Sequence, residues 1–392
     1  MTGTALVAHM TAALPRMLAG LESLVRCESP SADLDAVAAS ADVVAEVGTS
    51  LLGVRPERIV IEGRAHLRWR LGDGPPRVLL LGHHDTVWPI GSLDRHPFSV
   101  VDGVLRGPGC FDMKAGLIMA FHALAALPDP SGVTLLVTGD EEMGSPTSRG
   151  LVEEEASRCA AALVLEASAD GGALKTGRKG VSLYEVGVRG RAAHAGLEPE
   201  RGVNATVELA HQVLAVSALP DPARGTSVTP TVLVSGTTTN TVAEAGRFAV
   251  DVRVADAAEQ SRVDRAMRTL RPVLPGARLD IGGGPNRPPM EPAASAELFA
   301  RAVAVAARLG LPEPVGTAVG GASDGNLTAG VGTPTLDGLG AVGGGAHADD
   351  EHVLVAELPG RSALLAALTD DLLTVPALRA GRPARLLGEG RA

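Results

Sequence analysis

The chain has 392 residues, of which 45% are hydrophobic, and a formal net charge of −10. It is long enough for two domains with sizeable cores, and its negative charge argues against nucleic acid as a partner, because phosphate binding needs concentrated Lys and Arg. No apolar run approaches the roughly 20 residues that span a bilayer, so we expect no membrane partner. The chain has three scattered cysteines and no secretory signal, which suits a reducing compartment, so we expect a cytoplasmic protein.

Helical and strand patterns alternate through the first part of the chain. Apolar spacing predicts helices over 4–24 and 33–52, and the unbroken apolar run 78–81 predicts a strand that is covered on both faces. The pattern continues with helices at 114–127 and 146–156 and strands at 133–138 and 161–165. Such alternation predicts an α/β fold with a mostly parallel sheet flanked by helices.

The pattern changes near residue 177. A strand, a helix, two strands, a helix and a strand follow, at 181–188, 203–217, 231–235, 247–254, 259–270 and 278–281. This is the ferredoxin-like order. We therefore predict a ferredoxin-like α+β domain, 178–286, inserted into a discontinuous larger domain formed by 1–177 and 287–392, where helices at 294–309 and 358–373 restore the α/β character.

Side chains that can bind metal follow several of the predicted strands or lie in glycine-rich loops. They are His83, Asp112, Glu142, Glu166 and His347. Open α/β sheets place their ligands at the carboxyl ends of strands, and the adjacent Glu141 and Glu142 at the end of a buried strand would cost several kcal/mol without a compensating cation. Each residue alone has an ordinary explanation as a cap or a surface charge. Together they predict a two-metal hydrolytic site.

The motifs around these residues carry a family resemblance. They are Gly82–Val87, Gly107–Lys114, Asp140–Glu142, Leu163–Glu166 and the glycine-rich loop of His347. In residue type, order and spacing they resemble the di-zinc aminoacylase/carboxypeptidase family of metallopeptidases, and most closely its bacterial glutamate carboxypeptidases. The resemblance covers nearly the whole chain. It implies a phosphorylase/hydrolase-like catalytic domain with an inserted lid and dimerisation domain.

The resemblance also implies how the metal ligands are shared. Asp112 would bridge two zinc ions, with His83 and Glu166 completing one site and Glu142 and His347 the other. Cobalt or manganese would also suit such mixed histidine and carboxylate ligands.

The same resemblance assigns roles next to the metals. Glu141 would be the general base, and Asp85 would accept the second imidazole N–H of His83 and fix its tautomer. The peptide bond between Asp112 and Met113 would be cis.

In the inserted domain, His194 resembles the family histidine that reaches into the active site of a partner subunit and stabilises an oxyanion, which implies a homodimer. The alternative for His194 is a surface turn. Arg253 resembles the arginine that binds a substrate carboxylate, or else it is a strand residue paired with Asp251 or Glu244.

Three more residues resemble substrate-binding positions. Asn240 resembles a substrate-binding asparagine, and Ala322 and Ser323 resemble a turn that donates backbone N–H groups. The glutamate carboxypeptidases have three glycines in that turn, whereas here the third position is Ala322, so the sequence leaves open whether glutamate is the amino acid released.

A glutamate at position 166 resembles the carboxypeptidases and deacylases of the family, whereas the aminopeptidases and dipeptidases usually have aspartate. We therefore predict hydrolysis of a C-terminal peptide bond or of an N-acyl amino acid amide, with release of a free amino acid from a small substrate. An N-acetyl or N-succinyl amino acid deacylase with a biosynthetic or specialised substrate is the alternative. A non-catalytic binding protein is a more remote one.

Overall fold

The computed structural model describes residues 3–374, which divide into two compact units. The larger unit takes in the chain up to Gly177, Pro292–Val319 and the chain from Ser323 onward. The smaller unit comprises Arg178–Glu291 and Gly320–Ala322. Among residues 3–374, no helix combines the length and the apolar character needed to cross a membrane.

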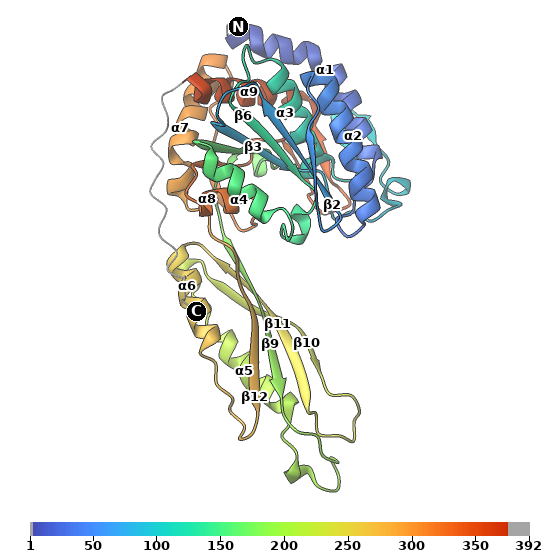
Figure 1. Ribbon diagram of the computed structural model, residues 1–392, viewed down its shortest axis with the longest axis vertical. Coiled ribbons are helices and arrows are strands. Elements are labelled where there is room, and N and C mark those ends of the chain that lie inside the picture. Colours follow the sequence, from blue (N-terminus) through green and yellow to red (C-terminus); the bar gives the residue numbers. More distant parts are fainter. Residues whose placement is uncertain (1–2, 375–392) are drawn as a thin grey trace. The chain divides into compact units, whose positions relative to one another are not determined.

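A six-stranded sheet forms the centre of the larger unit (Figure 1). Its strands, in spatial order, are β1 (Glu57–Ile61), β2 (Arg64–Leu71), β6 (Val133–Thr138), β3 (Val78–His83), β7 (Ala161–Val164) and β14 (Thr335–Leu336). The ladders from β6 to β14 are parallel, and β1 and β2 pair antiparallel at one edge. The predicted α/β class with a mostly parallel sheet is therefore confirmed.

Helices cover both faces of this sheet, which explains the unbroken apolar runs of its strands. One core lies under α1 (Gly3–Arg26), α2 (Leu34–Leu52), α3 (Ala115–Ala125), α7 (Pro292–Leu309) and α9 (Leu358–Thr374). The other lies under α4 (Arg149–Arg158) and α8 (Gly325–Gly330). Successive residues of a strand point to opposite faces: Leu80 belongs to the first core, and Leu79 and Leu81 belong to the second.

The parallel strands end at a common edge of the sheet. His83 is the last residue of β3 and pairs with Thr138, the last residue of β6. The loop after β7 begins at Leu165, whose N–H donates to Leu81 O on β3. Three loops therefore leave the sheet side by side at the carboxyl ends of their strands.

A small antiparallel sheet completes this edge. Its order is β15 (Gly343–Gly344), β16 (His352–Leu354), β5 (Val104–Arg106) and β4 (Ser99–Val101). Since β5 leads into the Gly107–Lys114 segment and β15 and β16 flank His347, the sheet brings Asp112 and His347 from distant parts of the sequence to one place. Elsewhere β8 (Leu174–Arg178) and β13 (Gly316–Val319) form a two-stranded sheet.

The smaller unit has the order β9 (Gly180–Arg189), α5 (Ala205–Ser217), β10 (Ser227–Ser235), β11 (Ala245–Val254), α6 (Ala257–Arg268) and β12 (Arg278–Arg287). Its sheet, β10-β11-β9-β12, is antiparallel throughout. Both helices pack on the face that carries Val186 and Phe248, and Leu183 of the other face is exposed. Strand β12 runs on to Arg287, past the 278–281 expected from the sequence.

An acidic residue of α6 gives the smaller unit a testable pH dependence. Glu259 is fully buried and accepts hydrogen bonds from Arg262 at 2.8 Å and Thr226 at 2.7 Å. These contacts, the Arg262 guanidinium foremost, lower the pKa of Glu259 from 4.5 to about 2. A lowered pKa stabilises the fold above pH 4.5, and this contribution is lost as the pH falls towards 2.

Replacing Glu259 by glutamine is therefore expected to lower the free energy of unfolding at neutral pH by about 2 kcal/mol, allowing for solvent screening at the partly exposed arginines. The difference should shrink on acidification from pH 4.5 to 2. Urea unfolding at several pH values measures it, with exposed Glu185→Gln on β9 as the matched control. Equal pH slopes in the two variants would contradict the prediction.

Candidate metal centre

Six metal-competent or acidic side chains gather at the carboxyl edge of the central sheet. His83 ends β3, Asp112 lies in the irregular turn Cys110–Lys114, Glu141 and Glu142 follow β6, Glu166 follows β7, and His347 follows β15. All of them belong to the larger unit.

The centre of the group is the carboxylate of Asp112. Its Oδ1 lies 3.3 Å from His83 Nε2, and its Oδ2 lies 3.4 Å from His347 Nε2. Glu166 Oε1 lies 3.6 Å from the same nitrogen of His83, and Glu142 Oε2 lies 3.1 Å from that of His347. Each imidazole thus has one Asp112 oxygen and one glutamate beside it, which is the division of ligands that the resemblance implies.

Two observations fit a divalent cation at this place. Ligand atoms of His83, Asp112 and Glu142 lie within 4.8 Å of one another, and so do those of His83, Glu141 and Glu166. The buried atoms His83 Nε2 and Asp112 Oδ1 make no hydrogen bond to any described residue, although buried polar atoms are nearly always paired. Mixed imidazole and carboxylate donors are those that zinc binds in hydrolases.

The protonation equilibria show the negative field at the centre. Burial lowers the pKa of His83, but the nearby carboxylates of Asp112, Asp85 and Glu166 outweigh it and raise this pKa well above its usual range. Hydrogen bonds to Asp112 and Glu142 raise the pKa of His347 to about 10. Burial raises the pKa of Glu142. The raised pKa values of both imidazoles thus follow from the carboxylates around them, an arrangement of negative charge that suits a cation.

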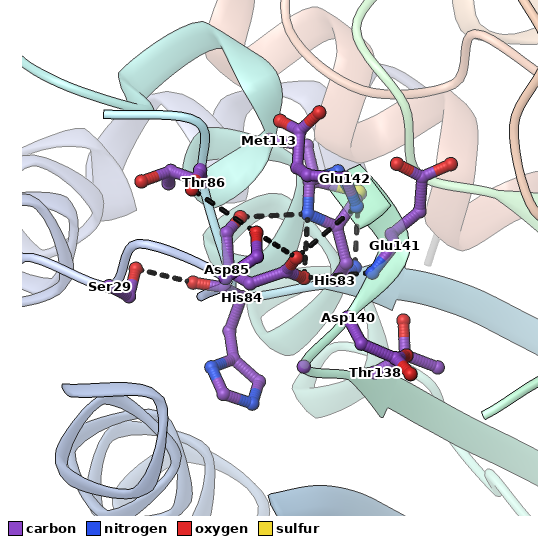
Figure 2. A network of polar contacts seen from close by, with 12 residues as sticks. Ser29, His83, His84, Asp85, Thr86, Met113, Thr138, Asp140, Glu141 and Glu142 are labelled. Atoms are coloured by element: carbon purple, nitrogen blue, oxygen red, sulfur yellow. Dashed lines mark hydrogen bonds and ion pairs between the residues drawn. The ribbon is translucent and has the colours of Figure 1, made fainter. Parts of the chain in front are cut away.

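Asp85 connects His83 to the turn of the two glutamates (Figure 2). It is fully buried, and its carboxylate accepts hydrogen bonds from the backbone N–H groups of Glu141 and Glu142, both at 3.2 Å, and from Ser31 Oγ at 2.6 Å. His83 Nδ1 lies 2.9 Å from the main-chain oxygen of Asp85 and 3.4 Å from its carboxylate. The main-chain oxygen is thus the nearer acceptor, and either contact leaves Nε2 of His83 directed at the centre.

Backbone geometry is unusual at two of the candidate ligands. The peptide bond between Asp112 and Met113 is cis, as the resemblance implied. His347 has a φ of +62°, a left-handed conformation that costs a non-glycine residue about 1–3 kcal/mol and that concentrates at functional sites. Gly109, with a φ of +69°, precedes the Asp112 turn, and a Cβ there would lie 2.5 Å from Thr86 Cγ2, so only glycine fits.

Two buried carboxylates, those of Asp140 and Glu351, hold these loops. Asp140 accepts hydrogen bonds from the N–H groups of Thr147 at 2.7 Å and Ser148 at 3.2 Å, which closes the loop around Glu141 and Glu142. Glu351 accepts hydrogen bonds from the Asp112 segment. Asp140 stands inside a motif already recognised, but Glu351 follows two other acidic residues and looks like surface charge in the sequence.

In the smaller unit, the structure places His194 beside Asn240. Thr241 forms an isolated bridge with His194, and Asn240 O accepts a hydrogen bond from Ala195 N at 2.9 Å. His194 Nδ1 lies 3.1 Å from the N–H groups of Gly196 and Leu197 and accepts from both. A neutral ring must then carry its proton on Nε2, which has no hydrogen-bond partner among residues 3–374.

Of the other predicted substrate-binding residues, Arg253 and Ser323 have partners within the protein. Arg253 forms a two-pronged ion pair with Asp251, with both N···O distances at 2.9 Å, which is the alternative that the sequence left open. Ser323 departs from the prediction, because its N–H donates to Asn326 Oδ1 and its hydroxyl donates to Asp337, so neither is available to a substrate. That the N–H of Ala322 donates to a substrate stays a prediction.

Comparisons with known proteins identify the family of this chain. A family model described as Peptidase family M20/M25/M40 matches residues 79–371. Carboxypeptidase G2 of Pseudomonas sp. (strain RS-16) is 31% identical over 375 residues, covering 91% of this chain and 89% of that protein. Succinyl-diaminopimelate desuccinylase of Granulibacter bethesdensis is 31% identical over 325 residues, covering 75% of this chain and 82% of that protein.

Solved structures share the fold. The M20 family metallo-carboxypeptidase Sso-CP2 from Sulfolobus solfataricus matches with a TM-score of 0.72 at 16% identity, over 91% of this chain and 99% of that one. Aminopeptidase PepT from Bacillus cereus matches with a TM-score of 0.71 at 22% identity, over 92% of this chain and 99% of that one. The family resemblance is confirmed: the chain is a hydrolase that belongs to peptidase family M20/M25/M40.

Proposed function

We propose that this hydrolase uses two zinc ions to cleave a C-terminal peptide bond or the amide of an N-acyl amino acid, and that it releases a free amino acid. The position of Asp112 supports this most directly, because its two oxygens face the imidazoles of His83 and His347 at 3.3 and 3.4 Å. With Glu166 on one side and Glu142 on the other, each half of the site would offer an imidazole, a glutamate and one oxygen of a shared aspartate.

Zinc, when bound, would polarise the scissile carbonyl and lower the pKa of the attacking water. The carboxylate of Glu141 would take a proton from that water and pass it to the nitrogen of the leaving amine as the C–N bond breaks. Its oxygen lies within 4.8 Å of ligand atoms of His83 and Glu166, so it is near enough to the centre for this role. Asp85 would hold both His83 and the Glu141 backbone in place.

A homodimer through the smaller unit is part of the proposal. Apolar side chains of α5 and β10 are exposed, Leu214 by 70% and Val232 by 74%, and exposed apolar side chains of this size are suited to an interface. His194 would act in the partner's site, where its Nε2–H would donate to the oxyanion that forms on the scissile carbonyl.

Replacing His194 by alanine is expected to lower kcat by about 10²–10³-fold, because one oxyanion donor is lost, and to leave metal content unchanged. If the site is shared, co-expression of His194→Ala with Glu141→Gln should restore part of the activity, since one site of each mixed dimer would have both residues intact. Assaying each variant alone and the co-expressed pair measures this. Absence of any recovery in mixed dimers would contradict a role in trans.

Two candidate activities, carboxypeptidase and deacylase, differ in the acyl group of the substrate. Similarity to carboxypeptidase G2 favours a carboxypeptidase, and similarity to a succinyl-diaminopimelate desuccinylase favours a deacylase acting on an N-succinyl or N-acetyl amino acid. Both use the same site chemistry.

We also propose a cytoplasmic location. Cys27, Cys110 and Cys159 are free thiols, which supports it.

Release of free amino acid from a substrate panel tests the proposal. The panel contains N-acetyl, N-succinyl and N-benzoyl amino acids and peptides with a C-terminal glutamate, each assayed with zinc and with a chelator. We expect release from one class, lost on chelation and recovered when zinc is returned. Release that persists after the metal has been removed would refute the metal-dependent mechanism, and the class that reacts decides between carboxypeptidase and deacylase.

A further inference from the structure

Glu351 is a buried carboxylate outside the proposed set of ligands and base. Only 4% of the residue is exposed, although it follows the two exposed acidic residues Asp349 and Asp350. Its Oε1 accepts hydrogen bonds from the N–H groups of Phe111 at 2.8 Å and Asp112 at 3.0 Å. Its Oε2 accepts from Gly109 N at 2.9 Å and from the indole of Trp88 at 2.6 Å.

The turn that Glu351 contacts cannot satisfy these N–H groups by itself. Asp112 and Met113 have non-helical backbone angles, with φ and ψ of −113° and 93° and of −134° and 32°. A buried N–H without a partner destabilises the fold, and all four donors around Glu351 point at one carboxylate. A glutamine there has a single acceptor oxygen, so its amide NH₂ would face two N–H donors. The site therefore requires a carboxylate.

The four contacts join three segments that carry candidate ligands. Asp112 is itself one of the donors. His347 precedes Glu351 in the same loop, where Glu351 N donates to Ala348 O at 3.0 Å. Trp88 follows the segment that contains His83 and Asp85. One buried carboxylate thus fixes the backbone of Asp112 relative to the loops of both imidazoles.

We propose that Glu351 is a positioning residue for the metal centre: it holds the Asp112 turn so that the two oxygens of Asp112 face His83 and His347. The inference rests on the proposed metal-dependent function. It differs from a merely structural role in one respect, which is that loss of the carboxylate should weaken metal binding in a protein that is still folded.

The test compares Glu351→Gln, Trp88→Phe and the matched control Glu208→Gln. Glu208 is likewise buried and accepts hydrogen bonds from backbone N–H groups, those of Val273 at 3.0 Å and Leu274 at 2.7 Å, but it belongs to the smaller unit. Zn²⁺ affinity is measured by competition with a chromophoric chelator. The visible absorption of the Co²⁺-loaded proteins reports ligand geometry, and circular dichroism reports folding.

Glu351→Gln is expected to weaken Zn²⁺ binding by ~10–100-fold, the usual effect of losing a residue that orients metal ligands, and to alter the Co²⁺ spectrum. Trp88→Phe removes a single donor and leaves the three backbone contacts, so its Zn²⁺ affinity should lie between those of Glu351→Gln and the parent. This variant keeps the test valid if Glu351→Gln does not fold. Glu208→Gln should bind both ions as the parent does.

Parent-like affinity and spectrum in folded Glu351→Gln and Trp88→Phe would overturn the inference and leave the proposed function intact. An equal loss of affinity in Glu208→Gln would also overturn it, because the effect would then reflect general destabilisation. Failure of the parent itself to bind Zn²⁺ would refute the proposed function and the inference together. The outcomes are thus distinct.

Discussion

Replacing Glu141 by glutamine is expected to lower kcat by at least about 10²–10⁴-fold, the usual contribution of a general base, with metal content unchanged. Glutamine keeps the size of the side chain but cannot accept a proton from water. The hydrogen bond from Glu141 N to Asp85 Oδ1, at 3.2 Å, involves only the backbone and should persist. The variant should therefore lose proton transfer while it keeps the metal ligands in place.

Initial rates and bound zinc per chain check this, with Glu154→Gln, at an exposed position of α4, as a control that makes the same change in charge. Near-parent turnover in Glu141→Gln would exclude Glu141 as the base. Loss of metal together with activity would instead make Glu141 a ligand, an outcome the geometry allows because its carboxylate lies within 4.8 Å of ligand atoms of His83 and Glu166.

The fold was predictable where periodicity is strong. The run 78–81 indicated a strand, and the structure extends it to His83. The order of strands and helices in the smaller unit followed from alternating apolar residues in β9 and β11. The four short strands of the sheet beside His347 were missed, because segments of two or three residues have no measurable period. The antiparallel edge formed by β1 and β2, of five and eight residues, was missed as well, although the apolar residues Ala65, Leu67, Trp69 and Leu71 of β2 alternate with polar ones.

The site was predictable where a motif fixes both residue type and place. His83, Asp112, Glu142, Glu166 and His347 are brought together as the sequence indicated. Burial is a tertiary property, so the sequence could not distinguish Glu351 from its two acidic neighbours. The pair of Arg253 with Asp251 was foreseeable, because residues two apart in a strand share a face, but nothing local showed that Asn326 and Asp337 occupy both donors of Ser323.

If the site holds the two zinc ions proposed above, replacing Asp112 by asparagine is expected to weaken the binding of both, each by more than about 100-fold, and to reduce activity to near background, because a ligand should matter more than the residues that orient it. Asparagine has one oxygen where Asp112 has two, so either His83 or His347 would face an amide NH₂. The loss of charge should act on both halves, since each imidazole lies within 3.4 Å of an Asp112 oxygen.

Zinc titration of the metal-free protein and metal content after dialysis test this. Asp371→Asn is the control for the same chemical change within the larger unit, because Asp371 on α9 pairs with Arg301 and Arg308; it should cost some stability and leave zinc binding unchanged. If Asp112→Asn lost one ion and bound the other with parent affinity, Asp112 would serve a single metal and the shared carboxylate would be excluded. Weakening of both ions beyond the ~10–100-fold expected for a residue that only orients ligands is the result that favours a bridging position, since Glu166 and Glu142 each lie beside one imidazole.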